Sequence, residues 1–226
     1  MLHYYPEEKY QRFFVLEGCD GSGKSTLAKL MGEKLQELGY SVLITQEPGG
    51  TPLALKMRDL FATPSSVTSH EQLTAESELL LVSAARSQHI RYKIIPGLND
   101  GKIVICDRFS DSTRVYQGLV GGNAKNHVES LIHMTSYGLT SPVTLILDGN
   151  PEIFLSRLNQ RKSGKGHTIA RFDQKALDFH QKIRQGFLQL ARQDNLRYYV
   201  LPADTLGPDE LLPQALSVVT KFLKRR

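Results

Sequence analysis

A glycine-rich turn followed by a lysine and a serine constrains this chain more than any other feature. Residues 14–26 read FVLEGCDGSGKST, an apolar run that breaks into glycines and continues into helix-forming residues. The segment fills every position of GxxxxGK[ST], in the strand, turn and helix context that this motif requires. Because glycines let a backbone wrap closely around a polyphosphate, the segment predicts a nucleoside triphosphate site. The alternative is a turn that only joins a strand to a helix.

The residue types in this loop indicate separate roles. We expect Lys24 to bring positive charge to the β and γ phosphates and Ser25 to offer a hydroxyl to Mg²⁺. The helix that begins near Lys24 would point its positive end at the same anion. The predicted ATP-binding residues are Gly18, Cys19, Asp20, Gly21, Ser22, Gly23, Lys24, Ser25 and Thr26.

Length and composition set the class of protein. With 226 residues, the chain can form one α/β domain over 1–226 without disulfides or a structural metal. Its two cysteines, Cys19 and Cys106, are far apart, which favours a reducing, cytoplasmic setting. No signal peptide is evident, and no run approaches about 18 apolar residues, so we expect no membrane span. A net charge of +5 without a nucleic-acid motif indicates phosphate ligands and no nucleic acid.

Short apolar runs alternate with longer stretches of helical character. The expected strands are 12–17, 41–45, 102–106, 143–148 and 197–201. The expected helices are 24–38, 53–61, 71–95 in one or two pieces, 124–137, 151–160, 173–194 and 209–224. With the glycine-rich motif, this alternation predicts a three-layer α/β P-loop fold, in which a five-stranded parallel sheet carries helices on both faces. Ligands in such folds gather beyond the carboxyl ends of the strands.

Two further motifs follow predicted strands. The segment EPGGT, residues 47–51, follows the second strand, and Arg58 comes after it. The segment DRF, residues 107–109, follows the third strand and precedes Ser112 and YQG at 116–118. Alone, EPGGT is also a good turn. The Asp107 and Arg108 side chains could form a buried ion pair, although a carboxylate at the end of a central strand is also where P-loop enzymes hold Mg²⁺.

Taken together, the glycine-rich loop, EPGGT, DRF with Ser112, and YQG resemble bacterial thymidylate kinases over about residues 14–201. The resemblance implies transfer of the γ-phosphoryl group of ATP to dTMP, with Mg²⁺, giving dTDP for dTTP biosynthesis. It also implies a homodimer. The acceptor-binding residues that it implies are Glu47, Pro48, Arg58, Val82, Arg86, Arg108, Ser112, Tyr116 and Gln117.

The resemblance also assigns roles. Arg58 and Arg108 match arginines that clamp the acceptor phosphate, a task that suits a planar bidentate donor. Asp20 matches an acidic residue that reaches the acceptor's 3′-hydroxyl and helps to hold Mg²⁺ with Ser25 and Asp107, although such an acid can also be a cap. The catalytic set then includes Lys24, Arg108 and Asp20.

Two more matches concern the acceptor's base and sugar. Arg86 matches the arginine that hydrogen-bonds thymine, although a solvent-exposed helix arginine is the plainer interpretation. Tyr116 matches the tyrosine that crowds the 2′ position of the sugar, or it only packs. The chain departs from the family at Val82, where relatives usually carry a stacking phenylalanine, and at Gln46, where many carry arginine.

A basic, glycine-containing stretch at about 157–172 matches the lid that supplies a catalytic arginine in one subclass of the family. Its cations are Arg157, Arg161, Lys162, Lys165 and Arg171. We expect Arg157 or Arg161 to act, and Arg171 after them, because Ser22 occupies the loop position where the other subclass carries its arginine. Without the match, a charge run is usually a solvated face.

Two other functions stay open at the level of sequence. The first is a broader pyrimidine monophosphate kinase, because the methyl group that separates thymine from uracil is worth only about 1 to 3 kcal/mol in a pocket. The second is a non-catalytic nucleotide sensor built on the same loop. The acceptor motifs and the basic lid argue against the sensor.

Overall fold

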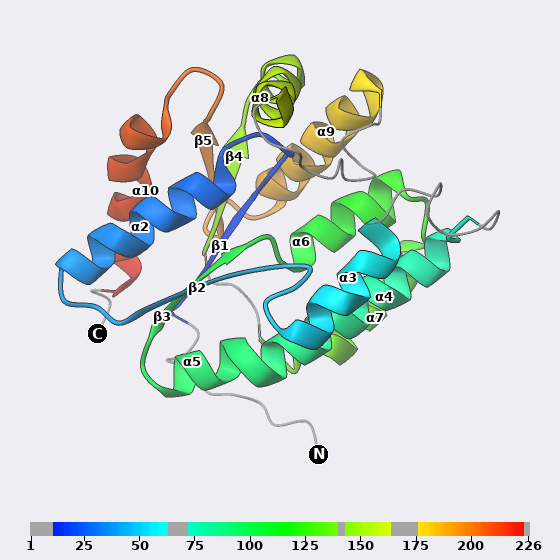
Figure 1. The fold of residues 1–226 in the computed structure, drawn as a ribbon, viewed down its shortest axis with the longest axis horizontal. Coiled ribbons are helices and arrows are strands. Elements are labelled where there is room, and N and C mark those ends of the chain that lie inside the picture. Colours follow the sequence, from blue (N-terminus) through cyan, green and yellow to red (C-terminus); the bar gives the residue numbers. More distant parts are fainter. Residues whose placement is uncertain (1–10, 63–71, 140–142, 164–175, 224–226) are drawn as a thin grey trace.

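A five-stranded parallel sheet forms the centre of the molecule (Figure 1). The computed structural model describes residues 11–62, 72–139, 143–163 and 176–223, with only the backbone for 161–163. The strands are β1 (Phe13–Gly18), β2 (Val42–Gln46), β3 (Ile103–Asp107), β4 (Val143–Asp148) and β5 (Tyr198–Pro202), in the order β2-β3-β1-β4-β5. All neighbours are parallel, and every predicted strand is confirmed to within one residue at each end.

The helices are α2 (Lys24–Glu37), α3 (Pro52–Ala62), α4 (Ala75–His89), α5 (Ile95–Asn99), α6 (Ser110–Thr113), α7 (Lys125–Ser136), α8 (Pro151–Ser163), α9 (Leu177–Gln193) and α10 (Pro208–Leu223). Two π-helical turns, η1 (Ile90–Ile94) and η2 (Arg114–Val120), continue α4 and α6. No described helix is long and apolar enough to cross a membrane.

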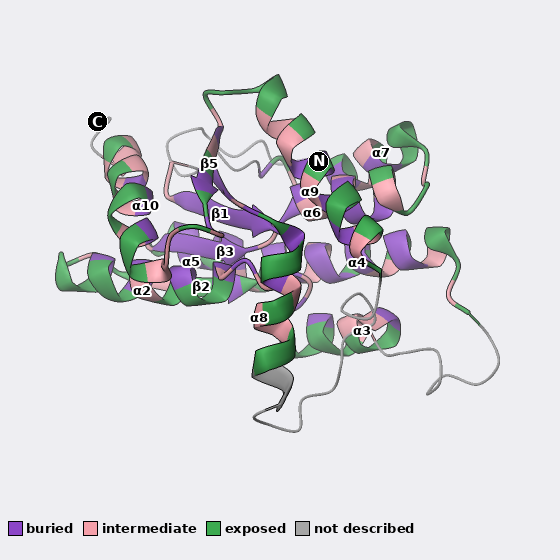
Figure 2. Cartoon of the chain, turned by 90° about the horizontal axis from the view of Figure 1, so that it is seen from above, coloured by how far each residue is buried: buried purple, intermediate pink, exposed green. Residues whose placement is uncertain are grey.

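Alternation along β1 explains why the sheet carries helices on both faces. Phe14 and Leu16 belong to a cluster with Leu27 and Met31 of α2, whereas Phe13 and Val15 pack with η1 and α5 in a second cluster. Successive side chains of a strand point to opposite faces, so α2 lies on one face and the α4 to α5 segment on the other. Figure 2 shows the inner strands β1, β3 and β4 as buried between partly exposed helices. The predicted fold class is confirmed.

Three differences from the predicted helices matter for the site. The helix expected at 71–95 begins at Ala75 and runs through η1 and α5 to Asn99. Residues 110–120, for which no helix was expected, form α6 and η2. The helix expected at 151–160 extends to Ser163, so the first residues of the predicted lid are helical, while 164–172 lie outside the described residues.

The register of the strands brings the motifs together. Asp107 is the Cα partner of both Leu16 on β1 and Gln46 on β2. The glycine-rich loop, EPGGT and DRF therefore leave the sheet from three adjacent strands at the same edge. This is the edge where ligands bind in open α/β sheets.

Candidate active site

The glycine-rich loop packs too closely against its neighbours for side chains at two positions. Gly18 and Gly21 have φ of +139° and +80°, and a Cβ there would lie 2.5 Å from the Leu147 carbonyl oxygen and 2.3 Å from that of Phe154. Only glycine fits both the backbone conformation and the space. The loop therefore rests on β4 and α8, and α2 begins directly behind it at Lys24.

The Lys24 ammonium group lies inside this loop. Its Nζ donates to the carbonyl oxygens of Gly18 at 3.2 Å and Cys19 at 2.7 Å. Burial lowers the pKa of Lys24, and the charge of Arg108 adds to that effect. A buried cation of this kind is a strong site for an anion, because an anion would restore the charge balance that burial removes.

Ser25 and Asp107 meet next to Lys24. The Ser25 hydroxyl donates to Asp107 Oδ2 at 2.5 Å, and Asp107 Oδ1 is buried without a hydrogen-bond partner among the described residues. A cleft runs from here toward α3 and α8. Its lining residues are Asp20, Gly21, Gly23, Lys24, Ser25, Gln46, Glu47, Arg58, Asp107, Arg108 and Leu158.

Arg108 connects the glycine-rich loop to α6 and η2. Its Nη2 donates to Asp20 at 2.7 Å and to the Tyr116 hydroxyl at 3.2 Å, and its Nη1 donates to Ser112 Oγ at 2.9 Å. The Tyr116 hydroxyl donates in turn to the other Asp20 oxygen, at 3.1 Å. Although burial alone raises the pKa of Asp20, the charges of Arg108 and Lys24 hold it well below its usual range. Asp20 is therefore an ionised partner of Arg108.

Glu17, the last side chain of β1 before the loop, is fully buried behind Arg108. Its Oε1 accepts the backbone N–H of Phe109 at 2.8 Å and of Ser112 at 3.0 Å, and its Oε2 accepts the Ser112 hydroxyl at 2.6 Å. Burial raises the pKa of Glu17 to about 7, although the nearby Arg108 charge lowers it.

Arg86 of α4 is held by a second buried carboxylate. Its Nε donates to Glu47 Oε2 at 2.9 Å, and its Nη2 donates to Thr113 Oγ1 at 2.6 Å. His89 Nδ1 lies 3.2 Å from Glu47 Oε1, and its Nε2 lies 2.6 Å from Thr45 Oγ1. The Arg86 Nη1 is buried and has no hydrogen-bond partner among the described residues, so one donor is left for a ligand.

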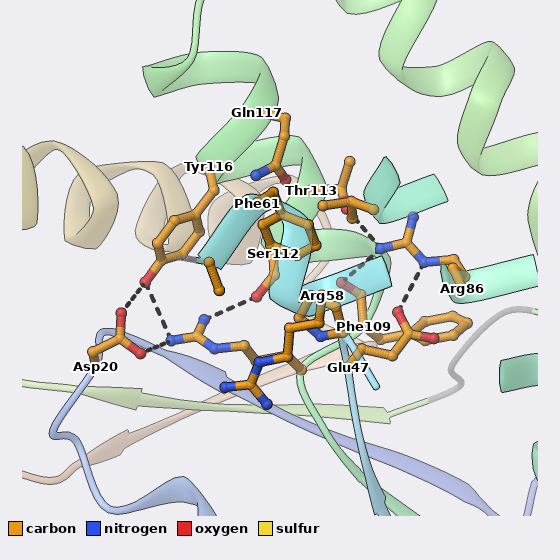
Figure 3. A pocket seen from close by; sticks show the side chains of 14 residues that line it. Asp20, Glu47, Arg58, Phe61, Arg86, Phe109, Ser112, Thr113, Tyr116 and Gln117 are labelled. Atoms are coloured by element: carbon orange, nitrogen blue, oxygen red, sulfur yellow. Dashed lines mark hydrogen bonds and ion pairs between the residues drawn. The ribbon is translucent and has the colours of Figure 1, made fainter. Parts of the chain in front are cut away.

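A pocket opens between α3, α4 and the α6 to η2 segment (Figure 3). All nine residues predicted to bind the acceptor line it: Glu47, Pro48, Arg58, Val82, Arg86, Arg108, Ser112, Tyr116 and Gln117. Asp20, Phe61, Ala62, Phe109 and Thr113 complete the lining. This pocket and the cleft beside Lys24 share four residues, Asp20, Glu47, Arg58 and Arg108. The two hollows therefore adjoin at a charged boundary.

Other predicted residues lie outside these hollows. Of the glycine-rich loop, Gly18, Cys19, Ser22 and Thr26 do not line the cleft; Cys19 is buried, with its Sγ 3.7 Å from the His180 carbonyl oxygen. Arg157 donates to the carbonyl oxygens of Ala203 at 2.7 Å and Asp204 at 3.4 Å. The Arg161 side chain, Lys165 and Arg171 are outside the described residues.

Sequence reasoning missed Glu17, Phe61, Thr113 and His89. A carboxylate inside an otherwise apolar strand was a usable signal for Glu17, because such a charge is not buried without donors. Phe61 gave no signal, since a phenylalanine in an amphipathic helix is most simply a core residue.

A family model described as thymidylate kinase matches residues 16–210. The chain belongs to the thymidylate kinase family. It is an ATP-dependent nucleotide kinase, and the predictions of family, enzyme class and reaction are confirmed.

Relatives from several bacteria cover most of the chain. The thymidylate kinase of Chlamydia abortus is 44% identical over 84% of this chain and 87% of its own length. That of Pelobacter propionicus is 37% identical over 95% and 94%. Among solved structures, the thymidylate kinase of Ehrlichia chaffeensis aligns with a TM-score of 0.70 at 29% identity, over 92% of this chain and 97% of that one.

Proposed function

We propose that the kinase binds ATP in the cleft beside Lys24 and dTMP in the pocket under α3, and transfers the γ-phosphoryl group across the boundary between them. The observation that carries this assignment is the adjoining of the two hollows at Arg58 and Arg108. An acceptor phosphate at that boundary would meet two guanidinium groups while facing the glycine-rich loop.

The chemistry at this boundary needs charge neutralisation more than proton transfer. The nucleophile is a phosphate oxygen of dTMP that is already ionised near neutral pH. The main barrier to the reaction is the repulsion between two polyanions. Aligning the two phosphates and neutralising their charge therefore accelerates the transfer. Lys24 serves the ATP side and Arg108 the acceptor side. Arg58, which lines both hollows, forms no hydrogen bond or ion pair with another described residue and is available for the acceptor phosphate.

The oxygen atoms at the strand ends suit Mg²⁺. The Ser25 hydroxyl and Asp107 carboxylate provide hard ligands, and the buried Asp107 Oδ1 lacks another partner among the described residues. No cluster of three His, Cys, Asp or Glu side chains suited to a metal occurs in the described part of the chain. The Ser25 and Asp107 oxygens would hold such an ion, and the ion would supply positive charge next to the β and γ phosphates. Asp20 Oδ1 accepts from Arg108 and Asp20 Oδ2 accepts from Tyr116, so we place Asp20 with the acceptor.

We propose that Phe61 supplies the aromatic face for the thymine base. Phe61 and Val82 line the same pocket from two helices, α3 and α4, and each is at least 95% buried. Phe109 and Tyr116 also line it, but the Phe109 ring is packed edge-on against Phe13, and the Tyr116 hydroxyl is held by Arg108 and Asp20. Base stacking on an aromatic ring is worth about 1 to 3 kcal/mol in single-strand binding proteins.

A reciprocal exchange tests this assignment. Phe61→Leu should raise the KM for dTMP by about 10- to 100-fold, in line with the loss of one stacking contact. The double variant Phe61→Leu/Val82→Phe restores a ring to the same pocket from the other helix and should recover most of the loss. An unchanged KM in Phe61→Leu would contradict the stacking role.

Acceptor strictness tests the function itself. Mg²⁺-dependent ADP release should be measured with dTMP, dUMP, UMP and dCMP side by side, and the phosphorylated product identified by mass. The Arg86 Nη1, which lacks a partner among the described residues, supports recognition of a base carbonyl, and Tyr116 in the same pocket supports exclusion of a 2′-hydroxyl. We expect dTMP to be preferred. Activity spread evenly over the four would favour a broader pyrimidine kinase, and no stimulation by any of them would contradict the kinase assignment.

We also propose a cytoplasmic homodimer. Five large apolar side chains are exposed on α3, α4 and η1: Leu53, Leu55, Leu60, Leu80 and Tyr92. A second copy of the chain would cover them, as the family resemblance implies. Light scattering should then give twice the chain mass, and Leu80→Glu/Tyr92→Glu should give a monomer.

The cytoplasmic location is supported by the cysteines. Cys19 and Cys106 are free thiols, which fits a reducing compartment.

A further inference from the structure

The backbone of Arg108 adopts a conformation that needs support. Its φ is +70°, in the left-handed region that residues other than glycine seldom occupy. Such a conformation persists only when the surroundings hold it. Three backbone donors around this turn bond to β1: Arg108 N–H to the Leu16 carbonyl at 2.9 Å, and the N–H groups of Phe109 and Ser112 to Glu17 Oε1.

The second carboxylate oxygen of Glu17 helps to orient the side chain of Arg108. Glu17 Oε2 accepts the Ser112 hydroxyl proton at 2.6 Å. Since that proton points at Glu17, the Ser112 oxygen presents lone pairs to Arg108 Nη1, which donates to it at 2.9 Å. The same Nη1 lies 3.9 Å from Glu17 Oε2. Glu17 thus acts on both ends of Arg108, the backbone through Oε1 and the guanidinium through Ser112.

The opposite side of the guanidinium is fixed by Asp20 at 2.7 Å. Asp20 is part of the glycine-rich loop and is charged. A mutation of Asp20 could therefore change ATP binding as well as the orientation of Arg108. Glu17 is different, because it is fully buried behind Arg108 and reaches no cleft. It can affect the acceptor only through the residues that it holds, Arg108 and Ser112.

We propose that Glu17 is a positioning residue that sets the backbone and guanidinium of Arg108 for the acceptor phosphate. The inference rests on the proposed role of Arg108 as an acceptor clamp. The competing interpretation is a purely structural acid that joins β1 to α6. The two differ in what a mutation changes: a structural acid alters the free energy of unfolding, whereas a positioning residue alters the KM for dTMP selectively.

Glu17→Gln keeps the side-chain shape but leaves one acceptor oxygen in place of two. We expect the KM for dTMP to rise by about 10- to 100-fold, the size of loss that follows when a binding group is displaced by about 1 Å. The KM for ATP and the thermal midpoint should change little. Glu129→Gln is the matched control, since Glu129 also accepts from an arginine, Arg114, but lines neither hollow; its KM for dTMP should equal that of the unchanged enzyme.

A double-mutant cycle with Ser112→Ala tests the route of the effect. If Glu17 acts through Ser112, the double variant should raise the KM for dTMP by much less than the product of the two single effects. If the two single effects on the KM for dTMP multiply fully in the double variant, Glu17 does not act through Ser112. An equal rise in both KM values, or a fall in thermal midpoint with no change in the KM for dTMP, would overturn the proposal in favour of a structural role.

Arg108→Ala separates this proposal from the one it rests on. If Arg108→Ala leaves the KM for dTMP unchanged, the clamp assignment itself fails. If Arg108→Ala raises it while Glu17→Gln and Ser112→Ala do not, only the positioning role of Glu17 fails. Should Glu17→Gln not fold, Glu17→Asp, which keeps the charge but shortens the side chain, must still raise the KM for dTMP without changing that for ATP.

Discussion

Arg86 Nε and Glu47 Oε2 form an ion pair at 2.9 Å, with the arginine side chain 1% and the glutamate side chain 3% exposed. The pair joins α4 to the EPGGT turn behind β2, and His89 bonds the other Glu47 oxygen. A carboxylate this deeply buried is tolerated because both its oxygens have partners. The turn after β2 and the α4 side of the pocket proposed for dTMP therefore share one support.

Removing the carboxylate should weaken the fold. Glu47→Ala is expected to lower the free energy of unfolding by about 3 to 5 kcal/mol, because it leaves Arg86 as an uncompensated buried charge. Urea unfolding measures this value. Glu37→Ala breaks the exposed pair with Lys34 and should change stability by less than about 1 kcal/mol. Similar losses in the two variants would show that the buried pair has no special role.

The closest approach in the glycine-rich loop predicts a stability difference between two glycines. Gly21 and Gly39 both have positive φ, +80° and +86°, but a Cβ at Gly21 meets the Phe154 carbonyl oxygen while Gly39 faces open space. Gly39→Ala should cost about 1 kcal/mol for the backbone alone. Gly21→Ala should cost more and also weaken ATP binding, which calorimetry can measure. Equal costs and intact ATP binding would contradict the close packing of the loop.

Stability should depend on pH through Glu17. Its pKa is raised from 4.5 to about 7 by burial, so the folded state keeps a proton that the unfolded state releases near 4.5. Stabilisation by protonated Glu17 is therefore fully present below about pH 4.5 and lost as the pH rises toward 7. Unfolding curves across this window should show the loss in the unchanged chain and a flatter profile in Glu17→Gln. Identical slopes would exclude Glu17 as the source.

Substitutions of Arg157 and Arg161, the first two candidates for the catalytic lid arginine, should affect different kinetic constants. Arg157 bonds the carbonyl oxygens of Ala203 and Asp204 after β5, away from the boundary of the two hollows. We expect Arg157→Ala to change mainly the KM for ATP. Arg161→Ala should instead lower kcat by about 10³- to 10⁵-fold, by analogy with arginine fingers. If Arg157→Ala shows the large loss in kcat, the assignments must be exchanged.

The strands, and the meeting of the predicted acceptor residues in one pocket, were predictable because they follow local rules. Apolar runs of about five residues between helical stretches fixed the five strands, and motifs that follow strands must meet at one edge of a parallel sheet. Residues 110–120 were missed as helix because SDST has low intrinsic helix propensity. What holds this segment is tertiary: buried Asp111 pairs with Arg114 and with Arg197, which lies 86 residues away.

Partners far apart in sequence explain the other omissions. The donors to Glu17 lie 92 and 95 residues along the chain, so no local pattern could connect them. Phe61 shows the same limit, because its place in the pocket depends on how α3 packs against α4. Val82 could be recognised as a departure from the family, but the Phe61 ring that lines the same pocket could not.

Asp20 belongs to the loop expected to hold ATP, yet it bonds Arg108 and Tyr116, both of which line the pocket proposed for dTMP. Any shift of this carboxylate when one nucleotide binds changes the groups that the other nucleotide meets. Thermodynamic linkage requires the influence to be mutual: if ATP alters the affinity for dTMP by some factor, dTMP must alter the affinity for ATP by the same factor. Asp20 is thus a direct physical connection through which binding at one site can alter binding at the other.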